Sequence, residues 1–400
     1  MKKDWEIKKL GDVCGFQNGF AFKSNTYRET GLPILRITNI QNQTLEVNDL
    51  VYFDTKDYKD NFEKFKVFKD DLVIAMSGAT TGKLGINTTD TIFYLNQRVG
   101  KFIPKKQIQK TFLYYFLSTK VEESLRIAAG AAQPNLSTEQ INNFEIPLPP
   151  LPEQQRIVSI LNQAFEQIEK AKTNAEQNLK NSKELFESYL QSVFEKKGNG
   201  WDEKTLGDVC SLITDGKHGD CQNEENSGYY FLSAKDVRNR TLLFDNARQI
   251  TKKDFEETHR RTNLKPDDIC MVNTGATIGR ISFAPDDPRT YKTTFQKSVA
   301  VIKTIPNLIN NHFCCYILQS DLKKLVKVSS GTAVPNLLLG DLKRHKINIP
   351  KSLSEQKAIV EKLDALSIET KKLEAIYEKK IVDLEELKKS ILQKAFNGEL

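Results

Sequence analysis

The sequence predicts an α/β fold of mixed topology (α+β), with two similar globular domains in tandem, each followed by one long helix. Three observations support this fold class. The chain repeats itself after about 200 residues, the first part of each repeat alternates short apolar runs with turn residues, and the last part lacks proline and glycine. A repeat of this length has the size of a domain, whereas solenoid units span only about 20 to 50 residues. We therefore divide the chain into residues 1–147, 148–198, 199–348 and 349–400, which are domain, helix, domain and helix in that order.

The two copies are colinear, because matching motifs follow one another in the same order. The opening Leu10-Gly11-Asp12-Val13-Cys14 is repeated letter for letter at 206–210. Small insertions shift the distance between the copies only slightly along the chain. The other matched pairs are Trp5 with Trp201, Asp70-Asp71 with Asp267-Asp268, 77–83 with 274–280, Gln97 with Gln296, 134–136 with 335–337, and Glu153-Gln154 with Glu355-Gln356.

Composition limits the class of protein. The 59 lysines and arginines exceed the 52 aspartates and glutamates, and the net charge of +7 favours an anionic partner mildly, although it also suits ordinary solubility. No apolar run reaches the roughly 18 residues of a membrane span, and residues 1–5 lack the apolar stretch of a secretory signal. We expect no membrane contact and a cytoplasmic location. The six cysteines form no CxxC pair and the four histidines have no metal-like spacing, so reduced, buried thiols are expected.

Each globular domain should combine short strands with one helix, although periodicity does not fix the strand order. Turns rich in Gly, Asn and Thr separate the apolar runs. In the first domain we expect strands at 32–40, 71–76 and 98–103 and a helix at 111–127; in the second, strands at 269–272 and 298–302 and a helix at 312–326.

A proline-containing segment leads from each domain into its long helix. Residues 146–152 read Ile-Pro-Leu-Pro-Pro-Leu-Pro, which is stiff and extended, and Pro152 suits the first turn of a helix. In the second copy, Ser352 and Glu355 are spaced as a capping box. Apolar residues in both helices then recur in steps of three and four, which is the 3.5-residue seam of a coiled coil.

The two helices either pair with each other or lie separately on their own domains. Pairing is favoured, because separate helices of about 45 residues would each leave a long apolar stripe uncovered. Helix 148–198 leaves the first domain and helix 349–400 starts at the second, so the coiled coil should be antiparallel and roughly 65 Å long at 1.5 Å per residue. Leu400 would then return close to Met1, and the molecule would be pseudo-two-fold symmetric with the helices as a spacer.

These motifs, in this order and repeated twice, resemble the specificity subunit of Type I restriction-modification enzymes. The resemblance covers essentially the whole chain. It rests on the Leu-Gly-Asp-Val openings, the Gly-Ala-Thr elements at 78–80 and 275–277, the Pro-Asn-Leu near each domain's end, the Glu-Gln helix starts at 153–154 and 355–356, and the terminal residues 395–400.

The resemblance implies a DNA-reading subunit with no catalysis and no cofactor of its own. Each globular domain would be a target-recognition domain that reads one half of a bipartite, asymmetric double-stranded DNA target, and the helices would fix the gap. The helices would also bind two methyltransferase subunits, which flip out an adenine and methylate its N6 with S-adenosylmethionine. Restriction and translocase subunits would join, with ATP and magnesium also expected on partner subunits. A rigid spacer between two readers does impose a fixed half-site separation.

Other functions fit the residues less well. No Asn/Asp-Pro-Pro-aromatic motif of a free-standing amino-methyltransferase occurs. Residues 78–84 are one residue too short between the glycines for a phosphate-binding loop, so they are either a tight strand connection or a contact to the DNA backbone. Asp267-Asp268 lacks the nearby Glu-x-Lys of a nuclease, and His312 with Cys314-Cys315 fits a core helix better than a metal site. A non-catalytic adaptor, whose duplicated domains bind proteins, stays open.

Candidate DNA contacts follow from side-chain chemistry: Arg and Lys read guanine, Asn and Gln read adenine, and Lys, Arg, Ser and Thr hold phosphates. For each candidate the alternative is a solvated surface residue or a turn-former. Shared positions such as Gln97 and Gln296 should build the fold or grip the backbone, so the divergent loops 25–31 and 218–228 are better candidates for specificity. The candidates are Gln17, Asn18, Lys23, Arg36, Ser77, Thr80, Lys83, Asn96, Gln97 and Arg98 in the first domain, and Lys217, His218, Lys235, Arg238, Thr274, Thr277, Arg280, Gln296 and Lys297 in the second.

Overall fold

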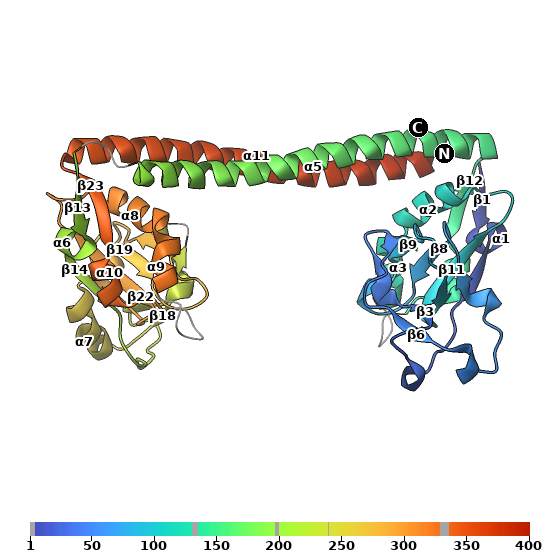
Figure 1. Ribbon diagram of the computed structural model, residues 1–400, viewed down its shortest axis with the longest axis horizontal. Coiled ribbons are helices and arrows are strands. Elements are labelled where there is room, and N and C mark those ends of the chain that lie inside the picture. Colours follow the sequence, from blue (N-terminus) through green and yellow to red (C-terminus); the bar gives the residue numbers. More distant parts are fainter. Residues whose placement is uncertain (1–4, 130–134, 197–199, 239, 329–335) are drawn as a thin grey trace. The chain divides into compact units, whose positions relative to one another are not determined.

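The structure is a computed structural model that describes residues 5–129, 135–196, 200–238, 240–328 and 336–400. Its contacts divide the chain into two units (Figure 1): the N-terminal unit holds residues 1–176 and 378–400, and the C-terminal unit holds 177–377. Each unit therefore contains one globular domain together with a part of each long helix. Pro134 and Pro335 of the matched Pro-Asn-Leu motifs lie outside the described residues.

In the N-terminal unit, the described part of the globular domain forms three sheets. A six-stranded sheet has the order β2-β11-β8-β9-β5-β4, a four-stranded sheet has the order β6-β3-β10-β7, and β1 pairs with β12. The strands are β1 (Glu6–Lys9), β2 (Cys14–Asn18), β3 (Leu32–Leu35), β4 (Ile40–Gln41), β5 (Thr44–Leu45), β6 (Val51–Phe53), β7 (Lys66–Val67), β8 (Leu72–Ala75), β9 (Leu84–Ile86), β10 (Phe93–Leu95), β11 (Val99–Pro104) and β12 (Glu145–Leu148). The helices are α1 (Leu10–Val13), α2 (Lys110–Thr119), α3 (Val121–Ala129) and α4 (Thr138–Asn142).

The C-terminal unit repeats this plan with smaller sheets. Its strand orders are β14-β22-β19-β20, β18-β15-β21, β13-β23 and β16-β17. The strands are β13 (Trp201–Thr205), β14 (Cys210–Asp215), β15 (Tyr230–Leu232), β16 (Val237–Arg238), β17 (Thr241–Leu242), β18 (Arg248–Gln249), β19 (Ile269–Val272), β20 (Ile281–Phe283), β21 (Thr293–Phe295), β22 (Val299–Thr304) and β23 (Lys346–Pro350). The helices are α6 (Leu206–Val209), α7 (Lys252–Thr262), α8 (Asn311–Ser320), α9 (Leu322–Val328) and α10 (Leu339–Arg344).

The central strand of each domain is apolar throughout because both of its faces are buried. Successive side chains of a strand point to opposite faces, so a strand covered on both sides reads as one apolar run. In β8, Leu72 and Ile74 join the core that includes α2, whereas Val73 and Ala75 join the core of the four-stranded sheet. In β19, the same division separates Ile269 and Met271 from Cys270 and Val272.

The predicted elements are largely confirmed, with three corrections. The strand expected at 32–40 ends at Leu35, and a 3-10 turn follows. The helix expected at 111–127 is broken at Lys120, and the helix expected at 312–326 is broken at Asp321. In the first case the Lys120 N–H bonds the carbonyl of Leu117 and tightens the last turn of α2. The break sets Ser124 of α3 against the glycine at position 82, where an added Cβ would lie 3.0 Å from the serine Cβ.

The long helices α5 (Leu151–Glu195) and α11 (Leu353–Asn397) pair antiparallel within the N-terminal unit, as predicted. Lys388 Nζ lies 2.9 Å from Glu169 Oε1, and Lys172 bonds Glu385 further along the pair. The end of α11 enters the N-terminal core, where Phe396 packs against Phe112 and Phe116 of α2 with ring centroids 5.1 and 5.7 Å apart. Arg156 also donates to the carbonyl of Leu400 at 2.7 Å, so the chain end returns to the first domain.

A buried glutamine at the start of each long helix fixes that helix to its domain. The Gln154 Oε1 accepts from the backbone N–H of Gln109 at 2.8 Å, and its Nε2 donates to the carbonyls of Gln107 and Pro149. Gln356 makes the corresponding three bonds to Asn310, Leu308 and Pro350. Both side chains are fully buried, so the Glu-Gln motif of the sequence is a structural anchor.

Only half of the predicted capping box forms at the start of α11. The Ser352 Oγ accepts from the Glu355 N–H at 3.4 Å, as expected. The Glu355 carboxylate instead accepts a hydrogen bond from the Trp201 indole at 2.9 Å. This hydrogen bond between Trp201 and Glu355 ties the first strand of the second domain to its helix.

Asp321, which lies between α8 and α9, should make the stability of the protein depend on pH. Burial alone would raise the pKa of the Asp321 carboxyl, but hydrogen bonds from His345 (2.9 Å) and Lys324 (2.7 Å) outweigh it and leave that pKa below its ordinary value. A lowered native pKa adds stability above the unfolded pKa of about 3.9, and this stability is lost as pH falls through the native pKa. Asp321→Asn should therefore destabilise the protein at pH 7 and cost progressively less below about pH 4. Urea unfolding of both proteins across this range measures the difference, and a pH-independent difference would contradict it.

Candidate nucleic-acid interface

The ends of several strands of the N-terminal domain meet at one edge. The turn between β10 and β11 lies at the centre: the Asn96 N–H bonds the carbonyl of Leu35 at the end of β3, and the Gln97 N–H bonds the carbonyl of Phe20 just after β2. The Met76 N–H, just after β8, bonds the carbonyl of Arg98. We call this surface the strand-end edge, and it comprises residues 18–20, 35–36, 76–77 and 96–98.

The C-terminal domain has the same strand-end edge, formed by residues 215–217, 232–233, 273–274 and 296–298. The Gln296 N–H bonds the carbonyl of Leu232, and the Lys297 N–H bonds the carbonyl of Lys217. The Asn273 N–H bonds the carbonyl of Ser298. The two domains therefore present the same backbone at this edge and differ in the side chains that it carries.

This backbone equivalence corrects one pairing made from the sequence. Gln296 occupies the place of Asn96, because it makes the matching hydrogen bond and the matching bridge, Lys217 to Gln296 where the first domain has Phe20 to Asn96. Gln97 consequently corresponds to Lys297, and both are exposed. The position taken to be shared is in fact divergent, which makes it a better candidate for sequence reading.

Several predicted candidates come together at the strand-end edges, and others lie elsewhere. Those at or immediately beside an edge are Gln17, Asn18, Arg36, Ser77, Asn96, Gln97, Arg98, Lys217, His218, Thr274, Gln296 and Lys297. Lys23 lies in the loop that follows β2, and Lys235 and Arg238 lie in and after the 3-10 turn that follows β15. Thr80, Lys83, Thr277 and Arg280 lie on the connection from β8 to β9 or from β19 to β20.

Several candidates at the edges have structural partners. Asn96 is only 8% exposed, and its Oδ1 accepts from the Arg98 N–H, which shapes the turn. The Arg36 guanidinium donates to the carbonyl of Asp49. The Thr274 hydroxyl donates to Asn336 Oδ1 at 2.7 Å, and the Asn18 Oδ1 accepts from Thr138 Oγ1. These contacts favour a role in building the edge for Asn96 and Thr274 in particular.

The Gly-Ala-Thr elements form tight strand connections, and their contact with the DNA backbone stays a prediction. Gly78 and Gly82 have φ of +76° and +83°, a backbone region that favours glycine. The Gly82 N–H bonds the carbonyl of Ala75, and the Lys83 N–H bonds that of Thr80, so the turn closes on itself. Lys83 is left exposed, as is Arg280 at the matching position.

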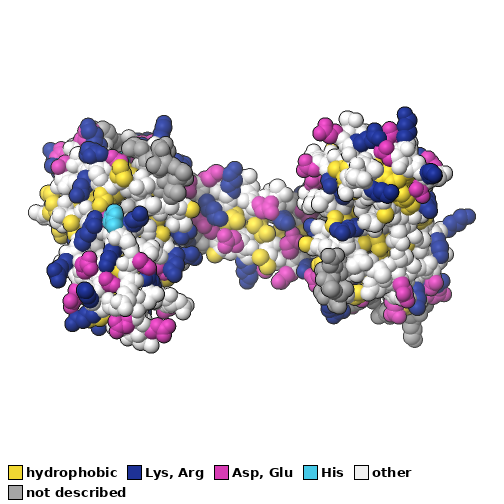
Figure 2. All heavy atoms as spheres, turned by 90° about the horizontal axis from the view of Figure 1, so that it is seen from below, with side chains coloured by type: hydrophobic (Ala, Val, Ile, Leu, Met, Phe, Trp, Pro, Cys, Tyr) yellow, Lys and Arg dark blue, Asp and Glu magenta, His cyan; other side chains and the backbone are white. Residues whose placement is uncertain are grey.

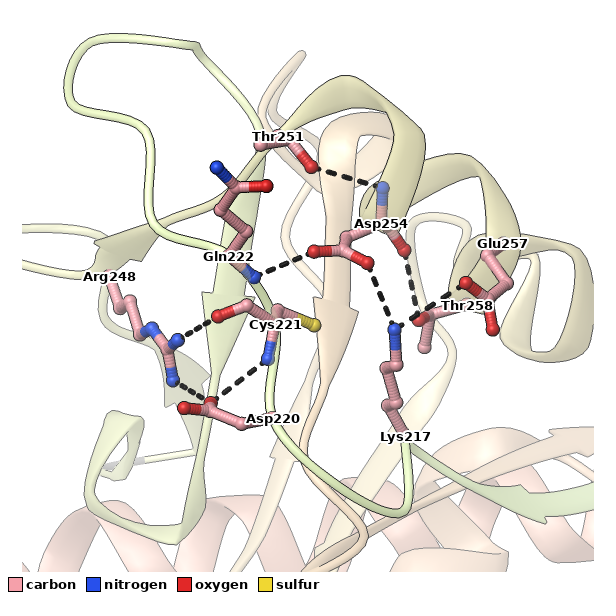
Figure 3. Close-up of polar contacts among 9 residues, drawn as sticks. All are labelled: Lys217, Asp220, Cys221, Gln222, Arg248, Thr251, Asp254, Glu257 and Thr258. Atoms are coloured by element: carbon pink, nitrogen blue, oxygen red, sulfur yellow. Dashed lines mark hydrogen bonds and ion pairs between the residues drawn. The ribbon is translucent and has the colours of Figure 1, made fainter.

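Within the C-terminal unit, Lys217 forms ion pairs and the His218 side chain is hydrogen-bonded to a carboxylate. Lys217 Nζ lies 3.0 Å from Asp254 Oδ1 and 3.5 Å from Glu257 Oε2 on helix α7 (Figure 3). His218 Nε2 lies 3.0 Å from Asp215, which also binds Arg261 of α7. Neither predicted candidate is therefore a free cation.

Helix α7 was missed in the sequence, although signals for it exist. The Thr251 Oγ1 accepts from the Asp254 N–H at 3.2 Å, which is an N-cap, and Phe255, Thr258 and Thr262 are buried at helical spacing. The N-terminal domain has only 3-10 turns after β6, where the C-terminal domain has α7 after β18. Arg261 of α7 reaches the strand-end edge through Asp215 and is a further candidate that sequence reasoning missed.

The described surface mixes positive and negative side chains and holds no metal-binding cluster. Figure 2 shows dark-blue Lys and Arg side chains spread over the visible face of each unit and interleaved with acidic ones. The described residues hold no group of three His, Cys, Asp or Glu side chains placed to bind a metal.

All six cysteines are free and buried, as expected, and burial raises the pKa of Cys14 to about 12. Every described helix is too short or too polar to span a bilayer.

Comparison with known proteins gives consistent matches along the chain. A family model described as the Type I restriction modification DNA specificity domain matches residues 2–177 and again residues 198–381. The specificity subunit of the Type I restriction enzyme EcoBI of Escherichia coli is 24% identical over 99% of this chain and 86% of its own length.

Two solved structures are similar in fold. One, described as the structural basis of complex assembly and conformational transition of the type I R-M system, matches with a TM-score of 0.78 and 20% identity, covering 100% of this chain and 99% of that chain. The HsdS subunit from Thermoanaerobacter tengcongensis matches with a TM-score of 0.63 and 19% identity, covering 100% of this chain and 98% of its own.

Proposed function

Because the chain belongs to the Type I restriction-modification DNA specificity family and carries its domain twice, we propose that each unit reads one half of a split DNA target through its strand-end edge. The chain is a DNA-sequence specificity subunit with two target-recognition domains. The observation that carries the proposed interface is that the two edges share one backbone and differ in their side chains: exposed Gln97 stands against exposed Lys297, and exposed Arg98 against partly buried Ser298. A common scaffold with variable tips suits a pair of readers for two different half-sites.

The chemistry of these side chains supports the proposal. Glutamine pairs with the adenine edge in the major groove, whereas lysine prefers the O6 and N7 acceptors of guanine or a phosphate. Exposed cations in the loops and strand connections outside the edges, such as Lys23, Lys83 and Arg280, would hold the DNA backbone. The two half-sites should therefore differ in sequence.

The long helices are proposed to set the gap between the half-sites and to bind two methyltransferase subunits. At about 1.5 Å per residue, a helix of 45 residues bounds the gap at roughly 20 base pairs of B-DNA. Exposed apolar side chains on the helices support partner binding: Val382 and Leu387 in the N-terminal unit, and Leu185, Ile368 and Ile376 in the C-terminal unit. Soluble proteins seldom repeat such exposure along one element without a partner.

In this proposal the chain contributes recognition and its partners contribute chemistry. The methyltransferase subunits would flip out an adenine in each half-site and methylate its N6 with S-adenosylmethionine. Restriction and translocase subunits would complete the restriction complex, with ATP and magnesium bound on partner subunits. The assembly would act in the cytoplasm, where its DNA substrate is found.

Exchanging the divergent side chains at the two edges tests the proposed interface. The chain, assembled with its cognate methyltransferase subunit, would be used to select duplexes from a random DNA library. Gln97→Lys should shift the preference at one position of one half-site from adenine towards guanine by about tenfold, and Lys297→Gln should change the other half-site only. If both variants select the wild-type sequence in both halves, the strand-end edge is not the reading surface.

A further inference from the structure

The loop that follows β14 in the C-terminal unit has an unusual composition for a DNA-facing segment. Residues 218–228 contain no lysine or arginine, whereas three amides and three carboxylates are exposed there. Amides and carboxylates donate or accept at base edges, adenine and cytosine in particular, and the anionic carboxylates do not hold phosphates. The exposed polar side chains of the loop are Asp220, Gln222, Asn223, Glu224, Glu225 and Asn226.

Asp254 of α7 clamps the start of this loop (Figure 3). Its Oδ2 accepts from the backbone N–H of Gln222 at 2.6 Å, and its Oδ1 accepts from Lys217 Nζ at 3.0 Å. The hydrogen bond from the Gln222 N–H and that from Lys217 lower the pKa of the Asp254 carboxyl, so the clamp stays ionised at neutral pH. The hydrogen bond to Asp254 in turn raises the pKa of Lys217.

Arg248 of β18 holds the same loop from its other side. Its guanidinium donates to the Asp220 carboxylate, to the carbonyl of Cys221 and to Asn223 Oδ1. Further along, the Glu224 N–H bonds the carbonyl of Gln249, and the Gly228 N–H bonds Gln249 Oε1 at 2.8 Å. The loop is thus fixed along its length to β18 and α7, although its side chains are exposed.

The N-terminal unit clamps its corresponding loop with different residues. Arg28 donates to Asp57 at 2.8 Å and lies 3.7 Å from Asp54, both in the segment after β6. Tyr58 of that segment accepts from the Lys23 N–H at 3.1 Å. In the N-terminal unit, the segment after β6 therefore holds the loop that follows β2. In the C-terminal unit, the segment after β18 likewise holds the loop that follows β14.

We propose that Asp254 and Arg248 are positioning residues for sequence specificity, which hold the 218–228 loop in the one conformation that reads bases. The proposal rests on the proposed function, because it assumes that the C-terminal unit reads DNA. A pre-formed loop loses little conformational entropy on binding, and it presents its amides and carboxylates in a fixed pattern. A released loop would adapt to several sequences, so discrimination should fall more than affinity. Asp57 has the same role for the other half-site.

The test compares clamp variants in a host that carries the chain with its cognate methyltransferase subunit, by sequencing N6-methyladenine. Asp254→Ala should methylate sites with single mismatches in one half-site at least about tenfold more than wild type, with the other half unchanged. Asp57→Ala should relax the opposite half. Asp254→Glu, which keeps the carboxylate, should restore discrimination. Asp287→Ala is the matched control, because Asp287 is similarly half-buried and binds Arg289 outside the loop.

The outcomes separate this inference from the function on which it rests. If wild type directs no motif, the proposed function fails and the clamp is not in question. If wild type directs a bipartite motif and Asp254→Ala relaxes neither half, relaxes both halves equally, or relaxes its half no more than Asp287→Ala does, the clamp has only a structural role and the inference is overturned. Thermal melting of each variant shows whether loss of stability is equal in Asp254→Ala and Asp287→Ala.

Discussion

Replacing Gly19 by alanine should disrupt the N-terminal strand-end edge strongly, because the added methyl group has no room there. A Cβ at this position would lie 2.0 Å from the carbonyl oxygen of Asn96 and 2.7 Å from that of Leu95. Backbone atoms cannot rotate away as side chains do, so the turn that carries Gln97 and Arg98 must move by more than 1 Å. We expect a loss of about 3 kcal/mol in the free energy of unfolding, because added volume that displaces backbone lies at the upper end of overpacking costs.

The functional consequence of Gly19→Ala should be confined to one half-site. Selected or methylated DNA should lose its preference in that half, while the half read by the C-terminal unit is kept. Gly216→Ala should do the reverse, since its Cβ would lie 1.9 Å from the carbonyl oxygen of Phe295. Gly15→Ala in β2 is the control, because its Cβ would make only ordinary contacts at 3.5 Å. Equal melting temperatures for Gly15→Ala and Gly19→Ala would refute the close-approach argument.

Replacing the buried anchor Gln154 by methionine should also cost about 3 kcal/mol of stability. Methionine has a similar volume but leaves the Gln109 N–H and the carbonyls of Gln107 and Pro149 without partners in a buried site. An unsatisfied buried group costs about 1 to 3 kcal/mol, and part of this is recovered by relaxation. Gln356→Met should behave alike in the C-terminal unit.

The double variant provides a sharper check of the anchors. The two glutamines share no partner and lie in different units, so their effects on stability should add. Gln163→Met, an exposed position of α5, should leave stability unchanged within about 0.5 kcal/mol. Denaturant unfolding of the wild type and of the four variants measures these free energies of unfolding. A double variant no less stable than either single one would show that the anchors are not independent.

Those parts of the fold that follow from local pattern could be predicted from the sequence. The run Leu72 to Met76 is apolar over more residues than a half-exposed strand allows, and β8 is indeed buried on both faces. The proline and glycine gap between Pro152 and Gly198 likewise marked α5 to within a few residues of its ends. The seam of the two helices predicted their pairing, since each apolar stripe needed a cover.

Those features that depend on tertiary contacts could not be predicted. The equivalence of Gln97 with Lys297 follows from which carbonyl each N–H reaches, whereas the letters alone favoured pairing Gln97 with Gln296. The hydrogen bond from Lys217 to Asp254 could be predicted only if the position of α7 were known. This helix is so polar that only three buried residues mark its inner face. The break at Lys120 depends on packing against Gly82, which lies far away in the sequence.

Two units on one pair of helices are proposed to read two halves of one DNA target. Sequencing of N6-methyladenine tests this in a host that carries this chain with its cognate methyltransferase subunit, compared with the same host without this chain. We expect a single bipartite motif with a fixed gap to become methylated only when the chain is present. If the subunits assemble and no motif changes, these domains do not read DNA, and the duplicated domains act as protein-binding adaptors.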